Sequence, residues 1–418
     1  MSVFIVRGGK PLSGSIEISG AKNSVLPILA ATLVNAGVSV LHNCPELRDV
    51  ASAIKILRHL GCKVTREGRT IVVDSTQLTR CDVPDQLMRE MRSSIMFLGP
   101  IIARCGKARV SMPGGCELGA RPIDLHLDAL RKLGVSITET GGEMLCEAGR
   151  MQGRDIILSF PSVGATENIM LAATACDGVT RIINAAREPE ICDLQEFLRK
   201  AGANISGAGG SEITIAGGNA RHDVTHRILP DRIEAATYLC AAAACGGDVE
   251  LRDLEPAHVG TVISCLRDAG CDIAIAGRSA RLRSTGRLSA MSPVRTMPYP
   301  GFPTDAQAPL MAVACVAHGS TLFLENIFEN RFRHTAELAR MGADIRVSGR
   351  MAVVEGGKPL HGTMVQSTDL RGGAALVIAA LCAEGESEIS DIYHIERGYE
   401  SMEKLLSSLG GDIKRVEK

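Results

Sequence analysis

The chain contains no tryptophan, and aromatic residues of all kinds make up only 3% of its 418 residues. Its core must therefore be filled by alanine, valine, isoleucine and leucine, and an apolar content of 45% suits a globular core. Long apolar runs are also missing, because they end after about ten residues and a membrane-spanning helix needs ~18. The start, Met1–Arg7, lacks the features of a signal peptide, so we expect a cytoplasmic protein.

Excess charge of one sign is absent too. A net charge of -1 provides no whole-chain attraction to nucleic acid or to an anionic membrane. The 14 cysteines include no C-x-x-C pair, which argues against a zinc site and against a secreted disulfide framework. Thirteen of them are expected to be small core residues in a reducing compartment. His222 and His226 have the spacing of a metal pair on a helix, but they flank a predicted strand or loop, so no metal site is expected.

An internal repeat is present. A helical pattern that ends in glycine and leads into a short strand occurs six times, at intervals of 68 to 73 residues. The glycines are Gly61, Gly134, Gly202, Gly270, Gly342 and Gly410. Glycine just past a helix tolerates the left-handed conformation that ends it, so each glycine predicts the end of an amphipathic helix.

A second type of helix alternates with the first and is apolar on nearly all sides. The segments are Val25–Leu33, Ser93–Ala103, Ile169–Ala175, Ala235–Ala244, Leu310–Val316 and Ala374–Leu381, and each ends near a further glycine, at Gly37, Gly106, Gly178, Gly246, Gly319 or Gly385. Such helices belong in a protein interior. Length alone suggests two or three domains, and six units of roughly 70 residues could divide three and three.

The segment Pro113–Pro122 contains three glycines and two prolines, so it is a shaped loop rather than a helix or central strand. Cys116 lies in its middle and Arg121 follows. A nearby cation or helix N-terminus would favour the thiolate, which makes Cys116 a candidate reactive thiol. The alternative, a buried structural cysteine in a tight turn, stays open on these residues alone.

Basic residues recur near the predicted helix starts, where they oppose the helix dipole. They are Lys22, Arg92, Arg232 and Arg371 at the apolar helices, and Arg48, Arg121, Arg187, Arg331 and Arg397 at the amphipathic ones. Helix N-termini present unpaired N–H groups that bind phosphate and carboxylate, so helix starts directed at one cleft would form an anion site. The alternative is local pairing, as in Asp231–Arg232 and Asp369–Arg371.

From end to end, the chain resembles the UDP-N-acetylglucosamine 1-carboxyvinyltransferases, a family of enolpyruvyl transferases. The matching segments are Ser19–Asn23, Pro113–Pro122, Ser162–Glu167, Asn184–Glu190, Leu229–Glu234, Phe302–Asp305, Glu329–Phe332, Thr368–Arg371 and Tyr393–Tyr399. The resemblance implies an α/β fold, a two-domain inside-out α/β barrel of six pseudo-repeats, three per domain, with buried helices and outer sheets. It places one domain at 22–229 and the other at 1–21 plus 230–418, with the active-site cleft between them.

The resemblance implies a reaction that moves the enolpyruvyl group of phosphoenolpyruvate to the 3′-hydroxyl of UDP-N-acetylglucosamine and releases phosphate, the first committed step of peptidoglycan synthesis. It implies that Lys22, Arg121 and Arg397 hold phosphoenolpyruvate, that Asn23 lies near the reacting centre, that Cys116 is the general acid and can carry a covalent adduct, and that Asp305 accepts the hydroxyl proton. The residues implied to line the nucleotide-sugar site are Arg92, Arg121, Pro122, Ile123, Asp124, Leu125, Ser162, Val163, Gly164 and Ile327. Arg331, Asp369 and Arg371 would complete the charged cleft. No metal, cofactor, nucleic acid or membrane is implied, and a monomer is expected.

Two departures from the family pattern bear on the site. Phe160-Pro161 stands where some relatives carry a lysine for the diphosphate, and Glu117 places a negative charge beside Cys116, which would raise the pKa of the thiol unless the carboxylate turned outward. An epoxide such as fosfomycin is expected to alkylate Cys116, which intact-mass measurement would detect. Three alternatives remain: the sister transferase that acts on shikimate 3-phosphate, a catalytically silent paralogue that binds a nucleotide sugar, and a purely structural repeat protein.

Overall fold

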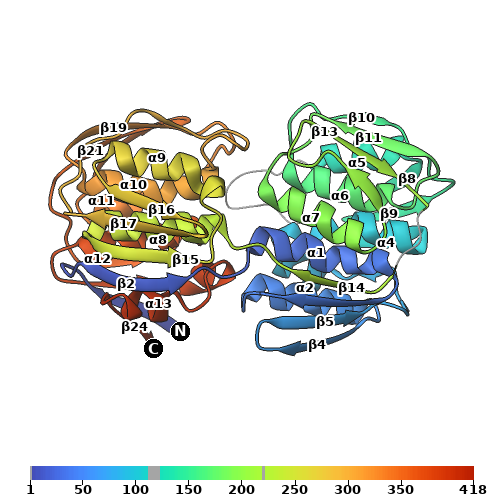
Figure 1. Cartoon of the computed structure of the whole chain (residues 1–418), viewed down its shortest axis with the longest axis horizontal. Helices are drawn as coiled ribbons and strands as arrows, with labels where there is room; N and C mark the ends of the chain where they lie inside the picture. Colours follow the sequence, from blue (N-terminus) through green and yellow to red (C-terminus); the bar gives the residue numbers. More distant parts are fainter. Residues whose placement is uncertain (1, 112–122, 219–221) are drawn as a thin grey trace. The chain divides into compact units, whose positions relative to one another are not determined.

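The structure is a computed structural model that describes residues 2–111, 123–218 and 222–418, with the side chain of Arg92 left out (Figure 1). The predicted loop with Cys116, Arg121 and Pro122 therefore lies outside the described residues. Contacts divide the chain into two compact units. Among the described residues, unit 1 comprises 2–19 and 230–418, and unit 2 comprises 20–111, 123–218 and 222–229.

The strands of unit 2 form three four-stranded sheets within the described residues. In sheet order, they are β14 (Val224–Arg227), β3 (Val38–His42), β5 (Thr70–Asp74) and β4 (Lys63–Glu67); β6 (Asp82–Val83), β7 (Lys107–Ser111), β9 (Glu143–Ala148) and β8 (Val135–Thr140); and β10 (Asp155–Ile157), β11 (Val179–Ile183), β13 (Glu212–Ala216) and β12 (Asn204–Ser206). In each sheet, the first two strands pair in parallel and the later pairs are antiparallel.

Unit 1 repeats this arrangement in three further sheets of described residues. They contain β2 (Leu12–Glu17), β15 (Gly247–Arg252), β17 (Ser279–Ser284) and β16 (Asp272–Ala276); β18 (Val294–Arg295), β19 (Gly319–Leu324), β21 (Met351–Gly356) and β20 (Asp344–Ser348); and β22 (Met364–Gln366), β23 (Glu386–Ser390), β1 (Ser2–Arg7) and β24 (Asp412–Glu417). Again the first pair of each sheet is parallel and the others are antiparallel. The chain therefore has a mixed α/β fold.

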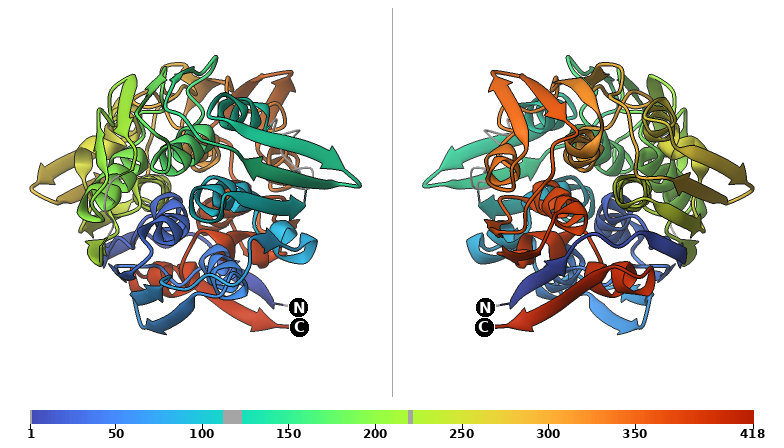
Figure 2. Two further views of the ribbon diagram at one scale, coloured as in Figure 1. Left: turned by 90° about the vertical axis from the view of Figure 1, so that its right-hand side faces the viewer. Right: turned by 90° about the vertical axis from the view of Figure 1, so that its left-hand side faces the viewer.

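The helices differ sharply in burial. The buried set comprises α1 (Lys22–Asn35), α4 (Leu98–Cys105) and α6 (Val163–Ala173) in unit 2, and α8 (Arg232–Cys245), α10 (Gln307–Val316) and α12 (Leu370–Cys382) in unit 1. The partly exposed set comprises α2 (Arg48–His59), α3 (Asp85–Glu90), α5 (Asp124–Lys132), α7 (Pro189–Lys200), α9 (Gly260–Asp268), α11 (Thr335–Arg340) and α13 (Met402–Ser408). Short 3-10 helices are η1 (Arg92–Phe97), η2 (Pro256–Val259), η3 (Thr304–Ala306) and η4 (Ile392–Arg397). In Figure 2 the strands form the outer layer of each unit.

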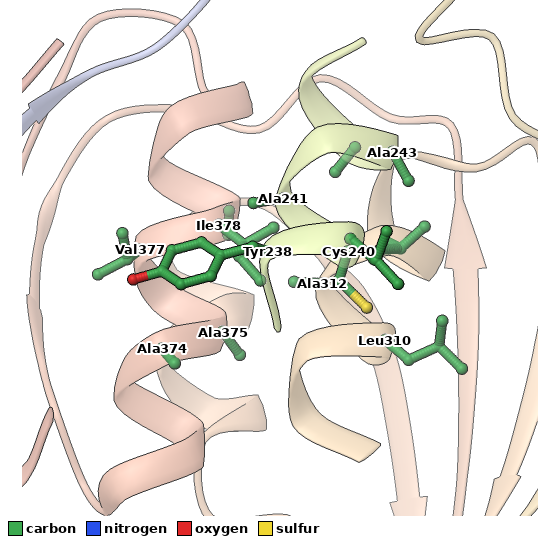
Figure 3. Close-up of a cluster of buried hydrophobic side chains, with 14 of the residues drawn as sticks. Tyr238, Cys240, Ala241, Ala243, Leu310, Ala312, Ala374, Ala375, Val377 and Ile378 are labelled. Carbon is green, nitrogen blue, oxygen red and sulfur yellow. The ribbon is translucent and has the colours of Figure 1, made fainter. Parts of the chain in front are cut away.

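Small side chains let the core helices of unit 1 approach closely. Alanines from α8, α10 and α12 meet in the centre, with Tyr238 and Cys240 among them (Figure 3). The abundance of alanine thus has a physical consequence, because small side chains let three adjacent helices pack closely around the single ring of Tyr238 that this view draws. Among the described residues, no helix is both long enough and apolar enough to cross a membrane.

The six repeat glycines have the predicted left-handed backbone, with φ between 92° and 106°. Each follows the end of an amphipathic helix. The second set of glycines follows the prediction except at α1, where Ala36 rather than Gly37 adopts the left-handed conformation. Gly37 is required for a different reason, because a Cβ there would come within 2.6 Å of an Asp223 carboxylate oxygen.

Alanine at Gly270 is expected to lower the free energy of unfolding by about 1–2 kcal/mol through backbone strain alone, since its φ is 103° and a Cβ would meet nothing within 4 Å. The same change at Gly61 should cost more, because a Cβ there would approach Thr79 to 2.6 Å. Urea denaturation of both variants measures the difference. Equal losses, or no loss at Gly270, would contradict the assignment of these glycines to helix ends.

The predicted apolar helix over Ser93–Ala103 is helical throughout, but its first part is a 3-10 helix and not an α-helix. The segment divides into η1 and α4 at Leu98. Pro100 has no N–H to donate within a helix, and the backbone N–H of Gly99 donates to the Asn168 side chain instead. A distant side chain therefore binds a backbone N–H close to the point where η1 changes into α4.

Candidate functional site

Lys22 and Asn23 open α1 in unit 2. The ammonium of Lys22 is buried and lies 2.7 Å from a carboxylate oxygen of Asp49, which stands in the first turn of α2. The Asp49 carboxylate thus pairs with a lysine that opposes the dipole of α1, while its own place in the first turn of α2 is favourable to the dipole of that helix. Asn23 is half-buried beside it. Sequence reasoning found Lys22 and Asn23 but missed Asp49.

The starts of α5 and α6 hold six other predicted residues. Ile123 precedes α5, whose first residues are Asp124 and Leu125. Ser162 is the N-cap of α6, and its hydroxyl accepts a hydrogen bond from the N–H of Ala165 at 3.4 Å. In the part of the chain that the structure describes, the N–H groups of Val163 and Gly164 have no acceptor. This first turn can therefore bind an anion.

Phe160 is 41% exposed and contributes no charge to this helix start. Its carbonyl accepts a hydrogen bond from the N–H of Ser162 at 2.7 Å. The Phe160 backbone therefore forms part of the turn before α6. An anion at this end of the helix would be bound by backbone N–H groups and not by the side chain of residue 160.

Asp305 is the centre of a charged network in unit 1. Its two carboxylate oxygens bind different arginines: Arg331 at 3.0 Å and Arg371 at 3.1 Å. Both arginine side chains are almost fully buried, whereas the Asp305 side chain is 29% exposed. Asp305 is therefore the member of the network that solvent or a ligand can reach.

Asp369 and Arg371 are two residues apart but do not pair with each other. The Asp369 carboxylate caps α12 by accepting hydrogen bonds from the N–H groups of Arg371 and Gly372, each at 3.0 Å. The Arg371 guanidinium reaches Asp305 instead and lies over the Tyr399 ring, 5.2 Å from its centroid. Local pairing is thus the wrong interpretation of this motif.

Burial alone would favour the protonated form of Asp369. The nearby Arg331 guanidinium and the helix N–H groups outweigh that effect and hold the pKa of Asp369 below its ordinary value. Asp369 is therefore an anion at neutral pH, and it sits 4.0 Å from Arg331. Arg331, Asp369 and Arg371, three of the four charged groups in this network, are thus held in place by bonds within unit 1.

Glu325 is a site residue that sequence reasoning missed. Its buried carboxylate accepts hydrogen bonds from the N–H groups of Ile327 and Phe328 at 2.8 and 3.0 Å, and from the Thr304 hydroxyl at 3.0 Å. It thereby ties the turn at Ile327 to the residue before Asp305. An isolated glutamate at the end of a strand carries no sequence signal of this role.

The idea that basic residues mark helix starts needs correction at two positions. Arg397 is the last residue of η4, and Arg331 precedes α11 by four residues. The Arg331 guanidinium instead binds the Thr304 carbonyl at 3.1 Å. Lys22, Arg232 and Arg371 do stand in first turns, and the backbone of Arg92 begins η1.

Two buried histidines make stability depend on pH. Burial lowers the pKa of His126 to about 4, and burial together with Arg331 lowers that of His334 to about 4 against the pull of Asp369. Between pH 6.5 and pH 4 the unfolded chain therefore binds protons at these two positions that the folded chain does not bind. As the pH falls through this range, the free energy of unfolding should decrease by about 3 kcal/mol for each histidine.

Urea denaturation at pH 7 and pH 4.5 tests this expectation. In His334→Leu, the loss between the two values should shrink relative to the parent chain, while neither protein should change between pH 7 and pH 8. An unaltered loss in the variant would count against a neutral, buried His334.

The described residues hold no group of three or more potential metal ligands. His226 instead forms a buried pair with Asp193 at 2.9 Å, while His222 is exposed. The thirteen described cysteines are free thiols, and seven of them are buried. Burial raises the pKa of Cys44 to about 12 and that of Cys146 to about 11, so these thiols are inert core groups.

Comparisons with known proteins agree over the length of the chain. Residues 6–406 match the family model described as EPSP synthase (3-phosphoshikimate 1-carboxyvinyltransferase). A protein of Caldanaerobacter subterraneus subsp. tengcongensis is named UDP-N-acetylglucosamine 1-carboxyvinyltransferase 2. It is 52% identical to this chain, and the comparison covers 100% of both chains. A Sorangium cellulosum protein named UDP-N-acetylglucosamine 1-carboxyvinyltransferase is 48% identical, with 100% of this chain and 99% of the relative covered.

Solved structures are similar as well. The enolpyruvyl transferase NikO from Streptomyces tendae has a TM-score of 0.90 at 26% identity, with 99% of each chain covered. EPSP synthase from Acinetobacter baumannii has a TM-score of 0.74 at 19% identity, with both chains covered to 100%, and supports the fold alone. From the family model and the full-length relatives, it follows that the chain belongs to the enolpyruvyl transferase family, which includes the EPSP synthases and the UDP-N-acetylglucosamine 1-carboxyvinyltransferases.

Proposed function

We propose that this chain is an enzyme that transfers the enolpyruvyl group of phosphoenolpyruvate to the 3′-hydroxyl of UDP-N-acetylglucosamine, with release of phosphate. The observation that carries the proposal is the 52% identity, over all of both chains, to a protein named for this activity. The reaction supplies a precursor of peptidoglycan, and thereby serves cell-wall growth, cell shape and division in the cytoplasm.

The reaction begins with protonation of the methylene carbon of phosphoenolpyruvate, which makes C2 electrophilic. The sugar hydroxyl adds to C2, its proton leaves to a base, and phosphate departs from the tetrahedral intermediate as the methyl group returns a proton and the vinyl bond reforms. The charges to be held are a carboxylate, a phosphate and a diphosphate, and clustered cations with helix N-termini suit them. No step requires a metal or an organic cofactor.

The roles in unit 2 follow from its two groups of helix starts. Lys22 and Asn23 would contact phosphoenolpyruvate, together with Arg397 of unit 1 and Arg121, which lies outside the described residues. The N–H groups of Val163 and Gly164 would receive the diphosphate at the start of α6, a role supported by their lack of an acceptor among the described residues. In this proposal the two N–H groups take the role in diphosphate binding that the family resemblance would give to a lysine near Phe160.

The rest of the nucleotide-sugar site would be formed by Arg92, Pro122, Ile123, Asp124, Leu125 and Ser162 in unit 2 and Ile327 in unit 1. Arg92 has no described side chain, and Pro122 lies outside the described residues. Cys116 lies there too, and its proposed roles are general acid and carrier of a covalent phosphoenolpyruvate adduct.

Asp305 of unit 1 would accept the proton of the sugar hydroxyl. Its partial exposure supports this role, because a substrate can reach the carboxylate, and its bonds to two arginines hold it in one orientation. Arg331, Asp369 and Arg371 would fix its position and supply positive charge. We further infer that the six sheets are copies of one repeat, three in each unit as an inside-out barrel, and that the enzyme is a monomer.

Phosphate release measured with phosphoenolpyruvate plus UDP-N-acetylglucosamine, beside phosphoenolpyruvate plus shikimate 3-phosphate, tests the proposal. Release with the nucleotide sugar alone is expected. Release with shikimate 3-phosphate alone would move the chain to the sister activity, whose name the matching family model carries. Release with neither would favour a silent nucleotide-sugar binding protein.

A further inference from the structure

Asn168 lies in the second turn of α6 and is fully buried. All three of the hydrogen bonds from its side chain leave its own helix. Its Oδ1 accepts from the N–H of Gly99 at 2.8 Å, and its Nδ2 donates to the carbonyl of Ile95 at 2.9 Å and contacts Nδ1 of His126 at 2.8 Å. One amide thereby joins α6 to η1, α4 and α5.

The orientation of this amide is determined by its backbone partners. The N–H of Gly99 can only donate, so it must meet the oxygen of Asn168, and the carbonyl of Ile95 can only accept, so it must meet the nitrogen. The second N–H of that nitrogen then faces His126. The Nδ1 atom of His126 must therefore accept, which places the proton of the neutral ring on Nε2.

Three of the four elements that Asn168 joins begin with residues of the proposed nucleotide-sugar site. Arg92 begins η1, Asp124 begins α5, and the anion-binding turn at Val163 begins α6. The His126 ring also packs on that turn, since a Cβ at Gly164 would lie 3.1 Å from its Cε1 atom. Asn168 is thus the common point from which these three helix starts take their relative positions.

We propose that Asn168 is a positioning residue for the nucleotide-sugar site: its amide holds the starts of η1, α5 and α6 in register and keeps His126 as the Nε2-protonated tautomer against Gly164. The proposal rests on the proposed function, because it concerns the substrate that these helix starts bind. Asn168 is buried beneath the site, so it acts through its neighbours and not by contact with substrate.

Asn168→Ala leaves the N–H of Gly99, the carbonyl of Ile95 and Nδ1 of His126 without their partner. The expected result is a rise of at least tenfold in KM for UDP-N-acetylglucosamine, with KM for phosphoenolpyruvate changed less than threefold, in a steady-state phosphate-release assay. The matched control is Asn35→Ala. Asn35 is equally buried and belongs to the same unit, but it is the last residue of α1 and bonds the Ser39 hydroxyl. Its variant should leave both KM values unchanged.

A measurement on the unmodified protein keeps the proposal testable even if Asn168→Ala does not fold. Imidazole nitrogen NMR, with His126 assigned by comparison with His126→Gln, should show Nε2 protonated and Nδ1 bare at neutral pH. The proposal is overturned if the ring shows the opposite tautomer or a cation, if both KM values rise together, or if Asn35→Ala gives the same pattern. An inactive parent chain would reject the proposed function and this inference together, whereas an active parent with no KM split in Asn168→Ala would reject the inference alone.

Discussion

The Asp305→Asn variant is expected to release phosphate ~10³-fold more slowly at saturating substrates, within the range for loss of a general base. The asparagine amide keeps the shape of the carboxylate and one oxygen that can accept from an arginine, but it cannot take up the hydroxyl proton. The loss should therefore fall on kcat, with much smaller changes in either KM. Steady-state kinetics at a temperature where circular dichroism shows folded protein measures it.

Asp248→Asn is the matched control for this experiment. Asp248 also binds two arginines, Arg281 and Arg283, in the same unit, but on the outer sheet at β15. Its side-chain hydrogen bonds to them lower its pKa to about 2, so this variant also removes a carboxylate that binds two arginines, but at a different place. Its kcat should equal that of the parent chain. An Asp305→Asn enzyme that retained more than a tenth of the parental kcat would exclude Asp305 as the base.

The fold was predictable where a residue type answers a local backbone requirement. The six repeat glycines at 68 to 73 residue spacing each end a helix in the left-handed conformation, which other residues adopt only with strain. Helices that are apolar on every side had to be interior, and α1, α8 and α12 are. Neither inference needs knowledge of what the segment contacts.

The errors arose where a residue far away in the sequence determines the local structure. Ser93–Ala103 is mostly apolar, yet Asn168 binds the N–H of Gly99 from 69 positions away and the helix changes from 3-10 to α near that point. Arg371 stands beside Asp369, but its partner is Asp305, 66 positions away. Glu325 and Asn168 looked ordinary because their function lies entirely in which backbone groups they meet. Sequence motifs therefore predicted which residues begin the helices. Only the structure identifies the side chains that bind these helix starts and hold them in place.

Asp305→Asn is also expected to lower the free energy of unfolding by about 3 kcal/mol, the lower end of the range for breaking a buried ion pair, since Asp305 is partly exposed. The reason is the asymmetry of the network. Removal of the carboxylate charge leaves the Arg371 guanidinium, whose side chain is 2% exposed, without the carboxylate to which it donates hydrogen bonds. Removal of Arg371 instead leaves a partly exposed carboxylate that is still bound to Arg331 at 3.0 Å.

A double-mutant cycle tests this asymmetry. Arg371→Met, which replaces the guanidinium by an apolar side chain of similar length, should destabilise the chain less than Asp305→Asn does, even though it also removes the contact with the Tyr399 ring. The double variant should be more stable than Asp305→Asn alone, because it no longer buries an unpaired cation. Urea denaturation of the four proteins gives the coupling. Additive losses would mean that Arg371 finds another anion when Asp305 is neutral, and the network would then not depend on Asp305 for its stability.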